Sequence, residues 1–411
     1  MSGASQMIVN LKSQVLNRFS DCFFWILLIA FLLIPFGAAR AAKGEAAGFI
    51  SSRIIQVGPL REIKYLSVAA KVAKDGDTVE VDAGDYPRDV AVWTQNNLIV
   101  RAIGGRVRLL ADGAAAEEKA IWVVRGGTMR VEGFDFEGAR VKDKNGAGIR
   151  LEKGFLTIFN CRFLNNENGV LTGGLADSTL DIINSEFGNN GAGDGQSHNL
   201  YVGAIGRLSV TGSYFHHAKI GHLLKSRAAI NDIRYNRLTD EIGGRASYEL
   251  EFPDGGVAYV VGNIIQQSST TDNPHLISYG AENYRWAKNE IYLVNNTLVD
   301  LRPNNGVFFR VKPGRVRIQA VNNLLIGKGS LEMAGEGLYR NNLNVDFDEF
   351  VRANREDFRI ASNSPLIGRG VVPDAAGNVD LRPSLEYWHP RSTRRPTTKS
   401  FSPGAMQTVG P

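Results

Sequence analysis

This sequence of 411 residues contains little cysteine and little proline, and its positive and negative charges nearly balance. The two cysteines are too few for the disulfide framework of a small secreted domain. A formal net charge of +5 is too small to indicate nucleic-acid binding. Stability therefore has to come from packing, and the partner has to belong to another class of molecule.

A single long apolar run lies near the N-terminus, from Cys22 to Ile34. Basic residues precede it and the motif Ala39-Arg40-Ala41 follows it, which is the pattern of a secretory signal peptide with its cleavage site. We therefore predict a signal peptide over residues 1–41, a linker over 42–56, and export to the periplasm or the extracellular space. The run is shorter than the ~20 residues of a membrane-spanning helix. The long leader before it leaves an uncleaved N-terminal membrane anchor as the alternative.

Cleavage after Ala41 would lower the formal net charge to +3 and leave Cys161 as the one cysteine. No intramolecular disulfide could then form. A mild positive charge of this size is compatible with an acidic polysaccharide as partner, and equally with ordinary solvated surface charge.

Glycine is abundant, with 45 residues against 14 prolines, which favours many short strands joined by tight turns over a bundle of helices. Segments of the form L-x-V-x-N-x-x-F recur along the chain. Their last residues are Phe136, Phe163, Phe187, Phe215, Leu238, Ile265, Leu298, Leu325 and Leu343. Most successive members are 23 to 28 residues apart, which is the length of one coil of a β-helix.

In each recurring segment, the position two residues before the last one lies on the same face of the strand as that last residue. Its occupants are Cys161, Ser185 and Ser213, followed by Asn236, Asn263, Asn296, Asn323 and Asn341. Buried amides that bond from coil to coil would explain asparagine on consecutive repeats. We predict an internal asparagine ladder, with Cys161 as a small inward residue and not a reactive thiol.

A second strand in each coil opens with a turn signal, as in Gly169-Val170-Leu171 and Gly221 to Lys225. These strands are expected to stack as a second parallel sheet. The pattern as a whole predicts an all-β fold, a single-stranded right-handed parallel β-helix solenoid over residues 57–370. Residues 371–411 are rich in proline, arginine and serine and are predicted to form an irregular tail.

A short helix is expected to cap the first coil, since Leu60 to Lys74 has helical spacing and Asp75-Gly76 ends it. The segment from Val57 to Tyr86 resembles the entry segment of pectate-lyase-like right-handed β-helix proteins, in which a short helix leads into a GDT-x-x-V strand. The segment from Asp357 to Gly370 is similar to the one that closes such helices. This superfamily includes lyases, hydrolases, epimerases and non-enzymatic binders, so the resemblance implies a fold and leaves the reaction open.

Chemically reactive side chains concentrate between His198 and Asp254. Aligning His198 with His222 on neighbouring coils places Tyr201 beside Lys225. Neighbouring parallel strands lie about 4.8 Å apart, so outward side chains on these coils would be close enough to act on one ligand. The residues expected in this outward column are Asn199, Tyr201, Lys225, Arg227, Glu249 and Glu251, with His217 and Lys219 in a turn beside it and His275 continuing the face.

Cleavage or epimerisation of a uronate polymer requires a cation for the carboxylate, a base for the C5 proton and an acid for the leaving oxygen. Lys225 is the predicted base, because the like charge of Arg227 favours its neutral form, although neighbouring glutamates favour the charged form. Arg227 is the predicted carboxylate clamp. Tyr201, His198 and His222 are the candidates for acid or alternative base.

The other residues of this region are predicted to bind substrate. They are Asn199, His217, Lys219, Glu249, Glu251 and His275. Glu249 and Glu251, helped by Asn199, are alternatively suited to hold Ca²⁺, which prefers hard oxygen ligands. No other cofactor is predicted.

The segment from His222 to Leu238 resembles a coil of alginate-lyase-like and chondroitinase-B-like β-helix lyases, which carries a lysine base in a Lys-Ser context. Glu249-Leu250-Glu251 is similar to the Glu-x-Glu calcium ligands of those families. In those families the calcium ligands lie on or before the coil that carries the lysine, and the coil after it carries an arginine that acts as the general acid. Here the acidic pair follows Lys225, and no arginine lies in Tyr248 to Phe252. The resemblance therefore implies only the role of Lys225 as base.

We expect an exported, monomeric, carbohydrate-active protein that acts on an acidic polysaccharide by β-elimination or C5-epimerisation. A non-catalytic glycan-binding or envelope-structural β-helix is the alternative, and a glycoside hydrolase that uses Glu249 with Glu251 or Asp254 is the third hypothesis.

Structural roles compete for the same residues. Lys225 and Glu249 could form a cross-strand ion pair. His198 and His222 have inward parity if the strands are regular. His216-His217 is expected to be a polar turn, because no third ligand lies at zinc spacing.

Overall fold

The computed structural model describes residues 53–304, 306–331 and 336–410. The predicted signal peptide and most of the predicted linker lie outside these residues. None of the helices in the described ranges has the length and apolar character needed to cross a membrane. The first strand begins at Ile54, three residues before the predicted start of the β-helix.

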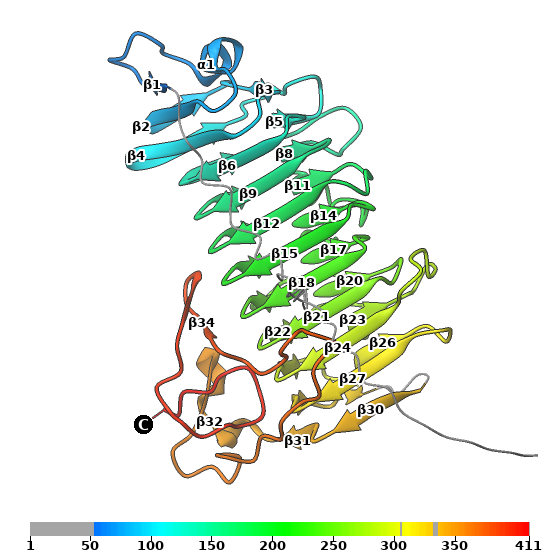
Figure 1. The fold of residues 1–411 in the computed structure, drawn as a ribbon. Coiled ribbons are helices and arrows are strands. Elements are labelled where there is room, and N and C mark those ends of the chain that lie inside the picture. Colours follow the sequence, from blue (N-terminus) through cyan, green and yellow to red (C-terminus); the bar gives the residue numbers. More distant parts are fainter. Residues whose placement is uncertain (1–52, 305, 332–335, 411) are drawn as a thin grey trace, which may run out of the picture. The chain divides into compact units, whose positions relative to one another are not determined.

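The described chain winds as a parallel β-helix in which successive coils stack strand upon strand (Figure 1). Each coil contributes one strand to a ten-stranded sheet and, in most coils, two strands to a larger sheet. Neighbouring coils pair in parallel, as Leu180 does with Leu208 and Val170 with Leu200. The prediction of an all-β parallel β-helix is confirmed.

The ten-stranded sheet carries the residues that the sequence singled out. Its strands are β3 (Ala91–Trp93), β5 (Ala120–Val124), β8 (Ala147–Leu151), β11 (Asn168–Thr172), β14 (Leu200–Val202), β17 (Leu224–Ser226), β20 (Leu250–Phe252), β23 (His275–Tyr279), β26 (Val307–Val311) and β29 (Ser330–Leu331).

The larger sheet forms the other two sides of each coil. Its strands are β1 (Ile54–Val57), β2 (Thr78–Pro87), β4 (Leu98–Leu110), β6 (Thr128–Glu132), β7 (Phe134–Glu137), β9 (Phe155–Phe159), β10 (Arg162–Leu164), β12 (Thr179–Ile183), β13 (Glu186–Gly188), β15 (Arg207–Thr211), β16 (Tyr214–His216), β18 (Ile230–Arg234), β19 (Arg237–Thr239), β21 (Val257–Val261), β22 (Ile264–Gln267), β24 (Glu290–Val294), β25 (Thr297–Asp300), β27 (Arg317–Val321), β28 (Leu324–Gly327), β30 (Gly337–Arg340) and β31 (Leu343–Val345).

The expected capping helix is α1 (Leu66–Val72), which occupies the second half of the predicted span. Its first amides are satisfied by Asp89, whose carboxylate accepts hydrogen bonds from the backbone N–H of Leu66 (2.6 Å) and of Ser67 (2.9 Å). Leu66 and Ala69 are fully buried. The helix therefore covers apolar side chains at the open end of the first coil.

A left-handed residue turns the chain between the two strands of the larger sheet on coil after coil. These residues, all with positive φ, are Asn160, Asn184, Gly212, Tyr235, Gly262, Asn295, Asn322 and Asn341. Glycine and asparagine adopt this conformation more readily than most residues. The residue after each turn points into the coil, and Cys161, Ser185 and Ser213 are fully buried there, as predicted.

Asparagines on five consecutive coils follow these three residues and are joined by amide hydrogen bonds. Nδ2 of Asn236 donates to Oδ1 of Asn263 at 3.1 Å, and the same contact joins Asn263 to Asn296 (3.1 Å), Asn296 to Asn323 (3.0 Å) and Asn323 to Asn342 (2.8 Å). Each Oδ1 also accepts the backbone N–H of the asparagine before it in the row. The buried amides are therefore satisfied by one another.

The sequence placed Asn341 in this row, and that assignment is wrong by one residue. Asn341 is the left-handed turn residue, and its Nδ2 donates to Oδ1 of Asn322 at 2.7 Å. The error arises because the last coil is short, so that Leu343 pairs with Leu324 and not with Leu325.

The interior is packed by rings and aliphatic side chains that also recur from coil to coil. Phe136, Phe163, Phe187 and Phe215 stack with ring centroids 4.9, 4.8 and 4.6 Å apart, and all four are fully buried. Cys161 lies in the same interior, where burial raises the pKa of its thiol to about 12. The thiol therefore stays protonated and unreactive at neutral pH.

The chain beyond β31 folds back against the outside of the larger sheet (orange to red in Figure 1). It contains η1 (Phe347–Glu349), β32 (Phe350–Arg352), η2 (Ala353–Arg355), β33 (Asp357–Ile360) and the hairpin of β34 (Glu386–Trp388) and β35 (Ser392–Arg394). Tyr387 and Met406 pack against Ile264 and Leu324 of the coils. Within residues 371–410 the β34–β35 hairpin is the regular structure, and this segment is attached to the solenoid through an apolar cluster.

Candidate functional site

Polar side chains of consecutive coils lie side by side on the outward row of the ten-stranded sheet. Tyr201 pairs with Lys225, Lys225 with Glu251, and Glu251 with Ser278. Arg227 follows Lys225 by two residues and so emerges on the same side. The predicted alignment of Tyr201 with Lys225 is confirmed.

Lys225 and Arg227 form a pair that we call the cation clamp. Nζ of Lys225 lies 3.2 Å from Oε2 of Glu251 and 3.4 Å from Oε1 of Glu282. Nη1 and Nη2 of Arg227 each lie 2.8 Å from an oxygen of Glu282, and Nη1 also lies 2.7 Å from Oδ1 of Asp254. Burial lowers the pKa of Arg227, but Glu282, Tyr201 and Asp254 together raise it by more, and the net shift is upward. The guanidinium therefore stays charged.

Tyr201 lies beside both cations of the clamp. The centroid of its ring is 5.7 Å from Nζ of Lys225 and 6.0 Å from Cζ of Arg227. Nε of Arg227 donates a hydrogen bond of 3.3 Å to the phenolic oxygen. A group that can exchange a proton thus lies against the group that can neutralise a carboxylate.

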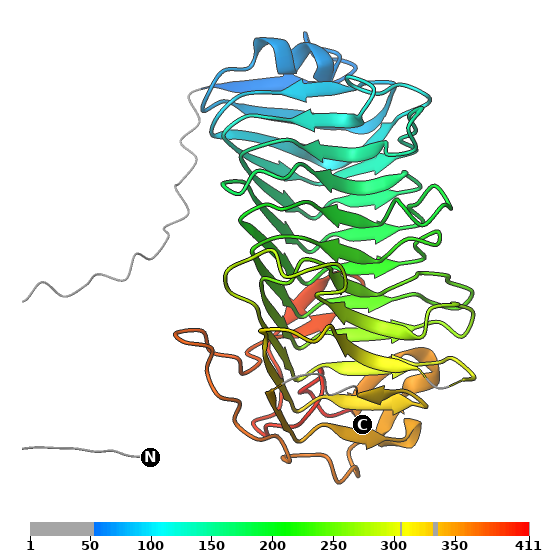
Figure 2. The same ribbon diagram turned by 90° about the vertical axis from the view of Figure 1, so that its right-hand side faces the viewer.

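Glu282 belongs to the loop 280–289 between β23 and β24, which leaves the stack and folds back along the preceding coils (Figure 2). The backbone N–H of Asn283 donates to the carbonyl of Pro253 (3.1 Å), and Nε1 of Trp286 donates to the carbonyl of Arg227 (3.1 Å). The hydrogen bond with Arg227 lowers the pKa of Glu282 despite partial burial. The sequence analysis missed Glu282, because nothing in the repeat indicates that this loop returns over earlier coils.

His198 and His222 lie behind the outward row, as their inward parity indicated. They are 2% and 7% exposed, with ring centroids 4.4 Å apart. Nδ1 of His198 accepts the backbone N–H of His222 (2.9 Å), so the proton of the neutral ring resides on Nε2. Burial lowers the pKa of both histidines. His198 is therefore a structural residue, and a direct catalytic role for it finds no support in this geometry.

His222 connects to the clamp through Glu251. Its Nε2 lies 2.8 Å from Oε2 of Glu251, the same oxygen that contacts Lys225. Burial raises the pKa of Glu251, but His222 and Lys225 together lower it by more than burial raises it. The net shift is downward, and the carboxyl stays ionised. His222 therefore orients the carboxylate that holds Lys225.

Asn199 and Glu249 were expected to face outward, and both lie inside the solenoid with no exposed surface. Oδ1 of Asn199 accepts Nδ2 of Asn190 (2.8 Å), and its own Nδ2 donates to the carbonyl of His216 (2.8 Å). Glu249 immediately precedes β20, where the chain is still turning the corner of the coil, so the alternation of a strand does not yet apply. The sequence offered Glu249 as the ion-pair partner of Lys225, whereas the observed partner on that coil is Glu251.

The other predicted ligand-binding residues lie apart from the clamp. His217 and Lys219 follow β16 and line a small hollow with Ile220 and Arg245, and this hollow contains neither Tyr201 nor the clamp. His217 is a left-handed turn residue, in line with the polar turn expected at this position.

His275 ends a row of rings behind the outward face. Its ring stacks on Tyr248 with centroids 6.2 Å apart, and Tyr248 in turn packs against His222 at 5.0 Å. This row supports the strands that carry the clamp.

The residues proposed for calcium do not fit that ion. Glu249 lies inside the coil, whereas Glu251 points outward to Lys225 and His222. Among the described residues, no group of three or more histidine, cysteine, aspartate or glutamate side chains is placed to hold a metal ion. Lys225 and Arg227 bring positive charge to this site, where they contact Glu251 and Asp254.

Comparison with known proteins identifies the fold. No protein-family model matches the chain, and no curated protein matches it. A solved structure, the crystal structure of pectate lyase Pel9A, superposes with a TM-score of 0.51 and 14% sequence identity over 82% of this chain and 97% of that chain. At this identity the similarity establishes a pectate-lyase-like parallel β-helix and does not extend to the reaction.

Proposed function

We propose that this protein is an exported polysaccharide lyase or C5-epimerase that binds an acidic glycan at the cation clamp. One observation carries the proposal: the clamp already holds a carboxylate, that of Glu282, in the two-pronged geometry by which arginine recognises carboxylates. A uronate carboxylate has the same charge and shape. It would replace Glu282 between Lys225 and Arg227.

The residues of the site match the three requirements of the chemistry. Arg227 neutralises the substrate carboxylate, which makes the C5 proton more acidic. Lys225 first releases its ammonium proton to solvent as the substrate displaces Glu282. As the amine it then takes the C5 proton, and the electron pair forms the C4=C5 bond as the C4–O bond breaks. Tyr201 gives its phenolic proton to the leaving oxygen, or in an epimerase returns a proton to the opposite face of C5.

A glycoside hydrolase fits these residues less well. That reaction needs one protonated carboxyl beside an ionised one. The pKa of Glu282 is lowered by Arg227, and that of Glu251 is lowered by His222 and Lys225 against the effect of burial. Both carboxylates are therefore held ionised, and neither can supply a proton to the leaving oxygen. Glu249, which the sequence paired with Glu251 or Asp254 for this reaction, has a raised pKa but is fully buried inside the coil, where a sugar cannot reach it.

The direct test is incubation of the protein with polygalacturonate, alginate and chondroitin. A lyase gives an unsaturated product that is detected by its ultraviolet absorbance, and an epimerase exchanges the C5 proton for deuterium in D₂O, which NMR detects. Neither signal with any of the three polymers would contradict the proposal. Retention on these polymers without either signal, weakened by Lys225→Ala, would instead support a non-catalytic glycan-binding protein.

The displacement of Glu282 leads to a separate prediction. Glu282→Gln keeps the shape of the side chain but removes the charge that competes with the substrate carboxylate, so the Kd for trigalacturonate should fall by roughly 10-fold. Isothermal titration calorimetry measures this. Glu132→Gln, which removes a glutamate ion-paired with Arg130 on the larger sheet, is the matched control and should leave the Kd unchanged. Weaker binding by Glu282→Gln would mean that Glu282 helps to hold the ligand.

A further inference from the structure

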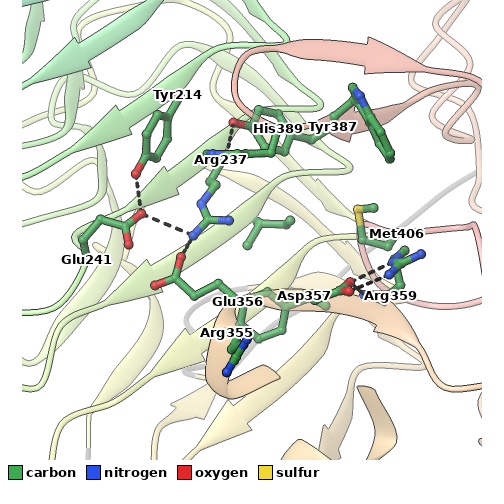
Figure 3. A pocket seen from close by; sticks show the side chains of 13 residues that line it. Tyr214, Arg237, Glu241, Arg355, Glu356, Asp357, Arg359, Tyr387, His389 and Met406 are labelled. Atoms are coloured by element: carbon green, nitrogen blue, oxygen red, sulfur yellow. Dashed lines mark hydrogen bonds and ion pairs between the residues drawn. The ribbon is translucent and has the colours of Figure 1, made fainter. Parts of the chain in front are cut away.

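A second cavity lies on the larger sheet, away from the ten-stranded sheet that carries the clamp. It has a volume of about 530 Å³, within the range of small-molecule sites. Its floor is formed by outward residues of β16, β19 and β22, and its walls by the chain around β33 and the β34–β35 hairpin (Figure 3). The C-terminal segment therefore creates this cavity where it packs on the coils.

The charged side chains of the cavity are balanced in number, with three arginines (Arg237, Arg355 and Arg359) and three carboxylates (Glu241, Glu356 and Asp357). Nη2 of Arg237 lies 3.3 Å from Oε1 of Glu241 and also contacts Glu356, and Nη2 of Arg359 lies 2.6 Å from Oδ2 of Asp357 (Figure 3). Arg237 is only 8% exposed, so its charge is satisfied by these carboxylates and little of it is left for an anion. The lining thus offers both donors and acceptors without a strong excess of either charge.

Aromatic rings make up much of the remaining lining. Tyr214 rises from β16, and its hydroxyl donates to Glu241 at 2.5 Å. Tyr387, Trp388 and His389 come from the hairpin, and Trp388 is 48% exposed while Tyr387 is buried. The guanidinium of Arg394 lies 3.8 Å from the centroid of the Trp388 ring and holds its orientation.

We propose that this cavity binds a neutral oligosaccharide. A sugar ring presents an apolar C–H face that packs on aromatic rings, and hydroxyl groups that both donate and accept hydrogen bonds. Aromatic rings beside balanced charges match these two properties. A uronate would be favoured by an excess of positive charge, whereas the three arginines of the lining are balanced by three carboxylates. The inference is independent of the proposed lyase or epimerase activity, because it involves none of the clamp residues.

The experiment is calorimetric titration of the full protein with cellopentaose and with maltopentaose, which present the β and α configurations of a neutral 1,4-linked glucan. The wild type should bind one of them, and Trp388→Ala should weaken that binding at least ~10-fold because an exposed aromatic contact is lost. Trp388→Phe keeps an aromatic face and should stay within roughly threefold of the wild type. Phe155→Ala removes a 50% exposed residue of β9 that does not line the cavity, and it should have no effect.

The outcomes separate this inference from the proposed function. Failure of both pentasaccharides to bind, or equal binding by wild type and Trp388→Ala, would overturn it. Binding of trigalacturonate that is lost in Trp388→Ala but kept in Lys225→Ala would show that the cavity binds an acidic sugar, and would overturn the proposal of a neutral ligand. If Trp388→Ala fails to fold, Tyr214→Phe serves in its place, because it removes only the hydroxyl that bonds Glu241 and should weaken binding a few-fold.

Discussion

Lys225→Ala is expected to lower the turnover number on the cleaved or epimerised uronate polymer by about 100-fold or more. Lys225 is the clamp residue that can accept a proton, and it is held between Glu251 and Glu282 in the outward row. Alanine removes the base and leaves Arg227 free to bind the carboxylate. The loss should therefore appear mainly in kcat and much less in KM. Initial rates of product formation measure both quantities.

A matched control for this variant lies on earlier coils. Lys119, which precedes β5, is also ion-paired with a glutamate, Glu152, at 2.7 Å, and β5 is four strands away from β17 in the ten-stranded sheet. Lys119→Ala should leave kcat unchanged. A Lys225→Ala protein that retains kcat within roughly threefold would exclude Lys225 as the base and transfer that role to Tyr201.

Glu249→Leu is expected to stabilise the folded protein by about 1–3 kcal/mol at neutral pH. Glu249 is fully buried, and neither of its carboxyl oxygens has a hydrogen-bond partner among the described residues. It occupies the position that Leu223 and Leu276 hold on the coils on either side, as the pairing of Leu250 with its neighbours in β17 and β23 requires. Leucine is similar in size and needs no partner.

The effect should depend on pH. Burial, and then the charge of Asp240, raise the pKa of Glu249 well above its ordinary value of 4.5. Below that ordinary value both the folded and the unfolded chain carry the proton. Above it only the unfolded chain releases the proton, so the contribution of Glu249 to stability falls as pH rises toward its folded-state pKa. The advantage of Glu249→Leu should therefore be larger at about pH 8 than at about pH 4.

Urea unfolding of the two proteins at both pH values measures this difference, and other titrating groups cancel in the comparison. Glu249→Gln is the informative control, because it removes the titration but keeps a polar group in the same place. It should flatten the pH dependence without the full gain in stability. A Glu249→Leu protein that is less stable than the wild type at pH 8 would show that the carboxylate has a stabilising partner.

The repeating part of the structure could be predicted because each contact recurs one coil later. The phenylalanine stack and the inward row from Cys161 to Asn323 were visible as positions about two dozen residues apart. The prediction slipped at Asn341, where the coil shortens and the interval changes. Counting residues succeeds in a solenoid as long as the turns keep their length.

The candidate site was only partly predictable for a related reason. Tyr201, Lys225 and Glu251 lie in strands, where alternation assigns each side chain to a face. Asn199 and Glu249 precede the strands, at a corner where the backbone rotates the side chain inward. No pattern in the local sequence distinguishes these two situations.

The sequence by itself determined the parallel coils, the buried asparagines and the outward row that carries Lys225, because in a wound ribbon the neighbours in space are set by the period of the repeat. Only the tertiary structure decided that Glu282 lies in the cation clamp and that the C-terminal segment forms a cavity with Arg237. These contacts join a loop and a tail to coils many residues away in the sequence. They do not recur from coil to coil, so the repeat does not predict them.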